Sequence, residues 1–401
     1  MRIFQVNDKF FYEGGTEIYI RQISAALKKL GHEIIIIYGD GPDPKKIKKE
    51  GFTAYQIPGL EEEFPKNKDQ VLGEIERLIS VEKPDIIQIN NILNGYFVNE
   101  FMTLAPTMRH VHDHRLYCPG FSKTWYNSNQ ICPIPFSVRC LVNAYKEHCA
   151  TNKPIKLLKK YQAKFYELEV NQKLPKILIA SKFMSTQLEI NDFDLKKVVI
   201  LPHPVTLPGR STVPKNKRQI LFVGRVTLEK GPQYAIEAMK GISGTLTIVG
   251  DGPQLEEYKQ LAQDLGVGRK VRFVGEVSQS HLWHYYNECD LLVFPSIWPE
   301  PHGKTGPEAM SFSRSVVGFD TGGVGEWLKD SFNGYLVNRL DVEGLVERIN
   351  FLLDNPEVNK EMGKNGREFV EKNMNESGYI NGLVKVYQDT MRIWQKEKVF
   401  A

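Results

Sequence analysis

The sequence predicts an α/β protein built from two Rossmann-like, doubly wound domains. Apolar strand-like runs alternate with helical stretches in two series, which are separated by a stiff segment that begins at Pro202-His203-Pro204. Glycine-containing loops follow several of the runs, as they do at the carboxyl edge of a parallel sheet. A chain of 401 residues is long enough for two domains with separate cores.

Composition excludes several classes of protein. The 41% hydrophobic and 25% charged residues are typical of a globular protein, and a net charge of +4 is too small and too dispersed to indicate nucleic-acid binding. No apolar stretch approaches the roughly 18 residues of a membrane span. Residues 1–7 lead directly into a strand, so no signal peptide is predicted and a cytoplasmic location is expected.

The first series starts with a strand, the pair Gly14-Gly15 and a helix at 17–30. The glycine pair either forms a plain tight turn or leaves the helix N-terminus bare for a phosphate or sugar. It is not a GxGxxG motif, so a nicotinamide cofactor is not expected. A helix is predicted at about 70–81, and further strands at 34–37, 85–90, 106–111, 176–180 and 197–201.

His112 is the best acid–base or hydrogen-bonding candidate of the first series. It follows the strand 106–111, and ligands gather at the carboxyl ends of parallel strands. Its neighbours His110 and His114 can be plain polar residues. The segment 117–150 that comes next shows no clear period, which indicates an irregular, lid-like excursion.

Four of the five cysteines lie in this excursion, namely Cys118, Cys132, Cys140 and Cys149. They could form a four-thiolate metal site, but the spacing is loose and contains no CxxC pair, so free thiols are the simpler interpretation and no metal site is assigned. A reducing compartment argues against structural disulfides. Cys289, beside an apolar run, is expected to be a small core residue.

A basic amphipathic helix is predicted at 154–173. In the simpler interpretation its apolar side faces the core and its basic side is solvated, and in the alternative the basic stretch 153–173 contacts anionic lipid at a membrane. The apolar residues are Leu157, Leu158, Tyr161, Phe165 and Leu168, and the lysines are Lys153, Lys156, Lys159, Lys160 and Lys164.

The second series predicts another doubly wound domain. Its strands fall near 219–223, 245–249, 271–274, 290–294 and 315–319, and helices at 341–354, 356–373 and 377–397 close the chain. Two domains joined by a hinge at 202–216 leave a cleft between them, which is the default ligand site.

The stretch 298–310 organises the second series. Glu300 and Glu308 bracket a loop with Gly303 and Gly306 that opens a short helix near Pro307. Backbone N–H groups at a helix start favour an anion, and the glycines let it approach closely. A carboxylate on each side suits hydroxyl groups on both sides of a phosphate, as in a nucleotide-sugar.

Two cations follow the first strand of this series, at the same sheet edge. The guanidinium of Arg225 offers a planar fork of donors and Lys230 a point charge, a pair suited to a diphosphate and to the charge that develops when it leaves. Gly252 opens another β–α turn. The strand that contains Val274 ends in a glycine, where a nucleobase could lie against the backbone.

Together these motifs resemble the retaining nucleotide-sugar glycosyltransferases of family 4, which have the GT-B fold. The matching strings are Gly224-Arg225 with Lys230-Gly231, Val249-Gly-Asp-Gly-Pro253, Pro295-Ser296 and Glu300-Pro-x-Gly303-x4-Glu308-Ala-Met310. The resemblance covers nearly the whole chain. It implies an acceptor-side domain of residues 1–205, a donor domain of 206–378 and a last helix, about 379–401, that packs back on the first domain.

The resemblance also implies roles for single residues. Arg225 and Lys230 would bind the diphosphate, Glu308 the ribose and Glu300 the donor sugar, while His112 would contact that sugar near the transferred carbon. The remaining donor-binding residues are Gly15, Gly252, Val274, Gly303, Lys304 and Thr305. His302 and Lys304 depart from the family, which commonly has an aromatic and an apolar residue there. No metal or cofactor is expected, because arginine and lysine replace the metal.

The expected reaction moves a hexosyl group from a UDP- or GDP-sugar to a hydroxyl of a glycan or lipid-linked acceptor. Retention by a front-face mechanism is favoured, because no carboxylate is convincingly placed as a nucleophile. Two alternatives stay open: a nucleotide-sugar epimerase or hydrolase on the same fold, and a non-catalytic sugar-nucleotide-binding module.

Overall fold

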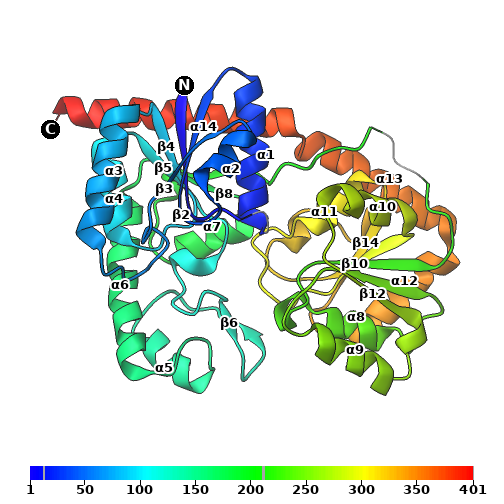
Figure 1. The fold of residues 1–401 in the computed structure, drawn as a ribbon. Helices are drawn as coiled ribbons and strands as arrows, with labels where there is room; N and C mark the ends of the chain where they lie inside the picture. The colour runs from blue at the N-terminus through cyan, green and yellow to red at the C-terminus, as the bar shows by residue number, and fades with distance from the viewer. Residues whose placement is uncertain (12–13, 210–212, 401) are drawn as a thin grey trace. The chain divides into compact units, whose positions relative to one another are not determined.

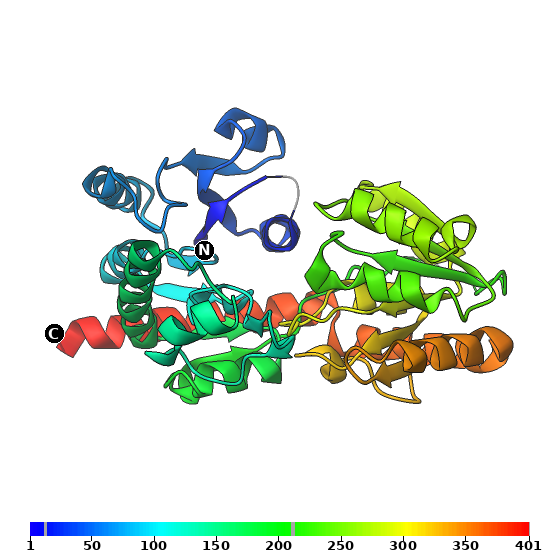
Figure 2. The ribbon, with the colours of Figure 1, turned by 90° about the horizontal axis from the view of Figure 1, so that it is seen from below.

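The computed structural model describes residues 1–11, 14–209 and 213–400, so Ala401 and part of the expected hinge at 202–216 lie outside the described residues. The chain divides into two compact units (Figure 1), one of residues 1–201 and 379–401 and the other of residues 202–378. Each unit holds a parallel sheet with helices on both faces, which is the α/β class that the sequence predicts (Figures 1 and 2).

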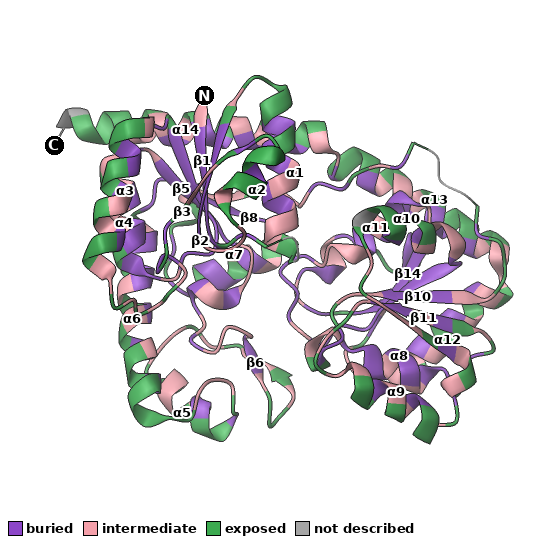
Figure 3. Cartoon of the chain, in the orientation of Figure 1, coloured by how far each residue is buried: buried purple, intermediate pink, exposed green. Residues whose placement is uncertain are grey.

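The first unit contains a seven-stranded parallel sheet in the order β3-β2-β1-β4-β5-β8-β9. Its strands are β1 (Arg2–Lys9), β2 (Glu33–Asp40), β3 (Thr53–Gln56), β4 (Ile86–Ile89), β5 (Thr107–His110), β8 (Ile177–Ile179) and β9 (Val198–Ile200). The run 34–37 is buried throughout, as expected for a strand covered by helices on both faces (Figure 3).

Helices cover both faces of this sheet. One face packs against α1 (Gly15–Lys29), α2 (Pro44–Lys49) and α14 (Glu376–Phe400). The other packs against α3 (Lys68–Glu82), α4 (Gly95–Leu104), α6 (Pro154–Lys173) and α7 (Lys182–Glu189). The segment between β5 and α6 holds η1 (His114–Leu116), the hairpin β6 (Thr124–Trp125) with β7 (Gln130–Ile131), and α5 (Arg139–Lys146), while η2 (Leu195–Lys197) precedes β9.

Polar contacts as well as apolar ones attach α14 to the first sheet. The hydroxyl of Tyr387 donates to Oε1 of Gln88 at 2.6 Å, and the amide of Gln5 donates back to that hydroxyl at 3.1 Å. The hydroxyls of Tyr19 and Tyr379 lie 2.7 Å apart. All these side chains are buried, so the hydrogen bonds fix the helix at one position on the sheet.

The second unit contains a six-stranded parallel sheet in the order β12-β11-β10-β13-β14-β15. Its strands are β10 (Gln219–Val223), β11 (Thr245–Val249), β12 (Val271–Gly275), β13 (Leu291–Phe294), β14 (Ser315–Phe319) and β15 (Gly334–Val337). The helices are η3 (Leu228–Lys230), α8 (Pro232–Ala238), α9 (Leu255–Asp264), η4 (Gly268–Lys270), α10 (Gln279–Glu288), α11 (Thr305–Ser311), η5 (Val324–Glu326), α12 (Val342–Asp354) and α13 (Pro356–Asn373).

The exposure of the side chains on helix α6 differs from the pattern expected from the sequence. Leu158 and Phe165, expected on the core face, are 49% and 56% exposed, whereas Lys164, expected on the solvated side, is fully buried. The reversal has a local cause, because Lys164 pairs with Glu167 one turn later and both lie under the chain that leaves β5. A buried lysine is tolerated only with such a partner.

The loop before α11 packs against a fully buried indole. A Cβ on Gly306 would lie 2.0 Å from the ring of Trp327, so only glycine fits at this position. The indole N–H donates to the carbonyl oxygen of His302 at 2.5 Å. Trp327 therefore sets the path of the 302–306 chain.

Replacing Gly306 with alanine should lower the free energy of unfolding of the second unit by about 1–3 kcal/mol, because the indole must move out of a packed core. Chemical denaturation measures the change. The matched control is Gly325→Ala, where the added Cβ meets its nearest neighbour at 3.5 Å, and there the change should stay within about 0.5 kcal/mol. Equal stability of the two variants would contradict this account of the packing.

Candidate active site

The strand order of the second sheet reverses at β10, which lies between β11 and β13. In open parallel sheets such a switch point forms a crevice at the carboxyl ends of the strands, where ligands bind. Lys230 ends η3, in the loop after β10, and Glu300 follows β13. The two residues therefore lie in the loops that follow the two strands flanking the crevice.

Lys230 and Glu300 form an ion pair at the switch point. Nζ of Lys230 lies 2.7 Å from Oε1 of Glu300, and the hydroxyl of Ser296 donates to the same oxygen at 2.6 Å. The side chain of Glu300 is 3% exposed and that of Lys230 is 24% exposed, so the pair has a buried carboxylate and a cation that reaches the surface. The ammonium also lies 4.8 Å from the centre of the Trp298 ring.

Backbone contacts hold the two loops together. The carbonyl oxygen of Glu229 accepts from the N–H groups of Ile297 and Trp298 and from the hydroxyl of Ser296, at 2.9, 3.1 and 3.1 Å. Gly231 has φ +72°, and a Cβ there would lie 1.9 Å from the carbonyl oxygen of Pro295. This close approach fixes the Lys230–Glu300 geometry before any ligand binds.

Glu308 lies in α11, at the other end of the loop. The hydroxyl of Tyr286 donates to its Oε2 at 3.0 Å, and Nζ of Lys304 lies 3.6 Å from its Oε1. Burial, together with the Glu308 charge, raises the pKa of Tyr286 well above its usual value, so the phenol stays protonated and donates. Each carboxylate of the 300–308 stretch is thus paired with a lysine.

The other predicted donor-binding residues of this unit lie along the same edge. Arg225 is exposed two residues after β10, and its neighbour Val226 donates its N–H to the carbonyl oxygen of Asp251 at 2.8 Å. Gly252 packs on the backbone of Val226, where a Cβ would lie 2.3 Å from the carbonyl oxygen. Val274 is half-buried near the end of β12, and Gly303 and Thr305 are half-buried beside Lys304.

His302 is 3% exposed and lies between the two glutamates in sequence. Burial, and next the charge of Lys304, lower its pKa to about 4. The ring lies 5.5 Å from that of His203, with the two planes nearly perpendicular. His302 is therefore a neutral packing residue.

The first unit carries a different set of side chains at the carboxyl edge of its sheet. Nε2 of His112 lies 2.9 Å from Oδ1 of Asn90, so the histidine after β5 is hydrogen-bonded to the residue after β4. Its ring contacts those of His110 and Tyr19, with centres 3.8 and 5.0 Å away. Gly15 is exposed at the first position of α1, whose N-cap, Gly14, has no side chain to cap it.

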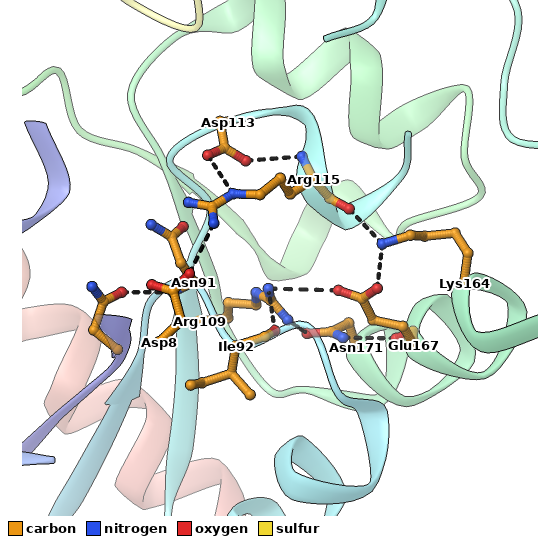
Figure 4. Close-up of polar contacts among 10 residues, drawn as sticks. Asp8, Asn91, Ile92, Arg109, Asp113, Arg115, Lys164, Glu167 and Asn171 are labelled. Atoms are coloured by element: carbon orange, nitrogen blue, oxygen red, sulfur yellow. Dashed lines mark hydrogen bonds and ion pairs between the residues drawn. The ribbon is translucent and has the colours of Figure 1, made fainter. Parts of the chain in front are cut away.

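A network of ion pairs lies next to this edge (Figure 4). Arg115 binds Asp113 at 2.8 Å and Asp8 at 2.9 Å, which links the segment after β5 to the end of β1. Lys164 contacts both Glu167 and the carbonyl oxygen of Arg115. The network fixes the chain directly after His112.

Three contacts of the site were not predicted from the sequence. The sequence shows Ser296 only as part of a motif, whereas in the structure its hydroxyl donates to Glu300. Tyr286 comes from α10 and Trp327 follows η5, and neither lies within a motif of the 298–310 stretch. Only the folded structure brings these two aromatic residues to Glu308 and His302.

Two family models match the chain. Residues 13–207 match the model described as Glycosyltransferase Family 4, and residues 206–369 match Glycosyl transferases group 1. The two matches overlap at residues 206–207 and together cover most of the chain. The chain belongs to glycosyltransferase family 4.

Curated relatives of this family 4 chain are distant. An uncharacterized glycosyltransferase of Methanocaldococcus jannaschii is 31% identical over 169 residues, which cover 42% of the chain and 47% of the relative. Alpha-D-kanosaminyltransferase of Streptomyces kanamyceticus is 27% identical over 175 residues, which cover 42% of the chain and 45% of the relative. The chain therefore spans less than half of the length of these relatives.

Solved structures show that the fold is GT-B, as the resemblance implies. Sucrose-phosphate synthase of Thermosynechococcus elongatus matches with a TM-score of 0.77 and 19% identity, over 98% of this chain and 100% of that one. Anabaena HepE in complex with UDP-glucose matches with a TM-score of 0.72 and 15% identity, over 99% of this chain and 100% of that one. The roles of single site residues stay predictions.

The buried His302 predicts a pH dependence of stability. Its folded pKa of about 4 lies below the ordinary 6.5, so the unfolded chain takes up the proton first as the pH falls. The stability that neutral His302 supplies is present above pH 6.5 and is lost as the pH falls toward 4. Between pH 7 and pH 5 the unfolding free energy should fall by about 1–2 kcal/mol more in the wild type than in His302→Phe. Identical pH profiles from urea titrations would contradict the prediction.

Proposed function

We propose that this protein is a retaining glycosyltransferase. It moves a hexosyl group from a UDP- or GDP-sugar to a hydroxyl of a glycan or lipid-linked sugar. The observation that carries the proposal is the set of charges at the switch point of the second sheet: the Lys230–Glu300 pair, the Lys304–Glu308 pair and the exposed Arg225. No metal or cofactor is part of the proposal.

The charges suit a donor that carries a diphosphate between two polyhydroxyl groups. Lys230 and Arg225 supply positive charge to the diphosphate, and the oxygens of Glu300 and Glu308 accept hydrogen bonds from sugar and ribose hydroxyls. Because Lys230 is already fixed by Glu300, it needs little reorganisation when charge develops on the leaving diphosphate. His112 at the donor sugar and the N–H groups of 303–305 at the phosphate complete the proposed contacts.

Within the proposed retaining reaction, the state of Glu300 favours a front-face mechanism over a covalent double displacement. Its carboxylate is buried and engaged by Lys230 and Ser296, which suits a hydrogen-bond acceptor better than a nucleophile. In the proposed step the bond between the anomeric carbon and the diphosphate oxygen breaks, and the acceptor oxygen bonds to the carbon on the same face. The acceptor proton passes to the departing diphosphate oxygen.

Solved structures of similar proteins support a UDP-sugar donor. Anabaena HepE was solved with UDP, with UDP and glucose, and with UDP-glucose, and another relative is a lipopolysaccharide outer core galactosyltransferase. A thermal-shift screen of UDP-, GDP- and ADP-sugars identifies the base and the sugar of this chain's donor. A ligand that binds the folded state raises the melting temperature.

Arg225→Met is the sharpest test of the charge site, since Lys230 also holds a buried carboxylate and its replacement would mix stability with binding. The variant should lose at least about 100-fold in kcat/KM for transfer while its stability changes by no more than about 0.5 kcal/mol. Arg269→Met is the matched control, because this exposed arginine lies in η4, before β12, at the amino edge of the same sheet. Full transfer activity in Arg225→Met would overturn the assigned site.

Product analysis separates the alternatives. With donor and no acceptor, rapid and complete turnover to free or epimerised sugar would indicate a hydrolase or epimerase. A protein that binds the donor but shows no turnover with any acceptor would be a binding module. Anomeric retention in the transferred product, read by NMR, would support the proposed mechanism, and inversion would contradict it.

A membrane-bound acceptor is supported by the first unit. A groove of about 700 Å³ lies at the start of α6 and is also lined by Glu63 and Phe64. Its walls carry Lys153, Lys156, Lys159 and Lys160. Beside these lysines Ile155 is 75% exposed. Basic side chains around an exposed apolar residue suit the surface of an anionic bilayer. None of the described helices has the length and apolar character needed to span a membrane.

The protein should therefore co-sediment with vesicles that contain phosphatidylglycerol and not with phosphatidylcholine vesicles alone. Changing Lys153, Lys156 and Lys159 to glutamate should weaken binding by at least about 100-fold, at about 1 kcal/mol for each lysine. The control makes the same charge change at the exposed Lys45, Lys46 and Lys48 of α2. Equal losses in both triple variants would show that only net charge matters.

A further inference from the structure

The segment between β5 and α6 has almost no hydrophobic core of its own. From residue 118 to residue 153, all of which the structure describes, Ala144 is the one buried aliphatic or aromatic side chain besides Pro119. The hairpin strands β6 and β7 are two residues each. A chain this short with so small a core would need a disulfide or a metal to hold one conformation by itself.

The backbone nevertheless folds back on itself and brings distant parts of the segment together. Tyr126 donates its N–H to the carbonyl oxygen of Glu147 at 2.9 Å, and the Glu147 carboxylate accepts from the hydroxyl of Ser128, also at 2.9 Å. A Cβ on Gly120 would lie 1.7 Å from the carbonyl oxygen of Cys149, so these two chains touch. The two ends of the segment therefore meet at its cysteines.

The four thiols of the segment are partly buried, and they are called the cysteine cluster here: Cys118, Cys132, Cys140 and Cys149. The sulfur of Cys132 lies 3.9 Å from the carbonyl oxygen of Ile134, and that of Cys140 lies 4.0 Å from the next carbonyl oxygen, of Pro135. Cys149 follows the Glu147 contact, and Cys118 precedes Gly120. Burial, and after it the charges of the other three thiols, raise the pKa of Cys149 to about 12.

A buried cation accompanies the cluster. Lys123 is 3% exposed, and its ammonium lies 4.0 Å from the sulfur of Cys132 and contacts the carbonyl oxygen of Ile134. A buried ammonium normally has an anionic partner. Thiolates at the cluster would supply that negative charge.

We propose that the cysteine cluster binds one zinc ion as a structural four-thiolate site. Four sulfur ligands are the donor set of closed structural zinc sites, and zinc is the redox-inert metal that favours them. On binding, the four thiols release four protons to solvent, and the bound Zn²⁺ with four thiolates carries a net charge of −2. Lys123 offsets part of that charge.

The fit requires a contraction of the cluster. A zinc–thiolate tetrahedron has edges of about 3.8 Å, whereas no three of the described cysteine sulfurs lie within 4.8 Å of one another. The sulfurs lie on irregular loops and on the start of α5, and the proposal includes backbone shifts there that bring them together. A coordinated thiol is deprotonated outright, so the metal also reverses the effect of burial on these groups.

Zinc measurement on the full chain, purified without chelators or immobilised metal, tests the proposal. Elemental analysis should find one zinc per chain. A mercurial that blocks thiols should release it, and cobalt substitution should give the intense visible bands of tetrahedral thiolate ligation. Cys140→Ser should lower the zinc content and make the 117–150 segment cleavable by trypsin at Lys123, Arg139 or Lys146. Cys289→Ala, at a buried cysteine of the second unit, is the matched control and should keep the full zinc content.

Several outcomes would overturn the proposal. One is a folded wild-type chain that stays free of zinc after equilibration with the ion and dialysis. Another is a disulfide between two cluster cysteines, detected by non-reducing mass spectrometry. A brown protein with stoichiometric iron and sulfide would also overturn the zinc assignment. Cobalt spectra of the wild type decide the matter even if a cysteine variant fails to fold.

Discussion

A buried carboxylate is stable only with a cationic partner. In the second unit this ion pair links the loop after β10 to the loop after β13, and the site depends on both loops. Glu300 is almost completely buried after β13, and its partner Lys230 comes from the loop after β10. Removal of either charge alone would leave the other uncompensated. The carbonyl oxygen of Glu229 and the close approach at Gly231 hold the same two loops at backbone level. The charge pair and the backbone contacts therefore define one rigid crevice.

The two sheets share a topology but place different chemistry at their carboxyl edges. The second edge carries lysines paired with carboxylates, where strong electric fields act on a charged ligand. The first edge carries His112, Asn90 and aromatic rings, which offer directional hydrogen bonds and flat contact surfaces. Under the proposed function, the second edge binds the diphosphate and the first recognises neutral hydroxyl groups.

Sequence patterns predicted the two doubly wound sheets, because strands buried on both faces are continuous apolar runs. The short edge strands β3 and β15 were not indicated, since four residues at a sheet edge carry little pattern. Glu300, Glu308, Arg225 and Lys230 stood out as charges beside glycines at strand ends. Tyr286, the partner of Glu308, did not stand out, and neither did the burial of Lys164 in the first unit. Both residues acquire their contacts only through packing, and no local spacing encodes them.

Helix α14 has a consequence for the order in which the chain folds. Its residues Ile380, Leu383 and Tyr387 complete the first unit's core against Ile3 and Ile20, although the whole second unit is synthesised between these parts. During translation the second unit can close on its own residues, whereas the face of the first sheet that α1 and α2 cover in part stays incomplete until α14 emerges. The first unit is therefore the later of the two to complete its core.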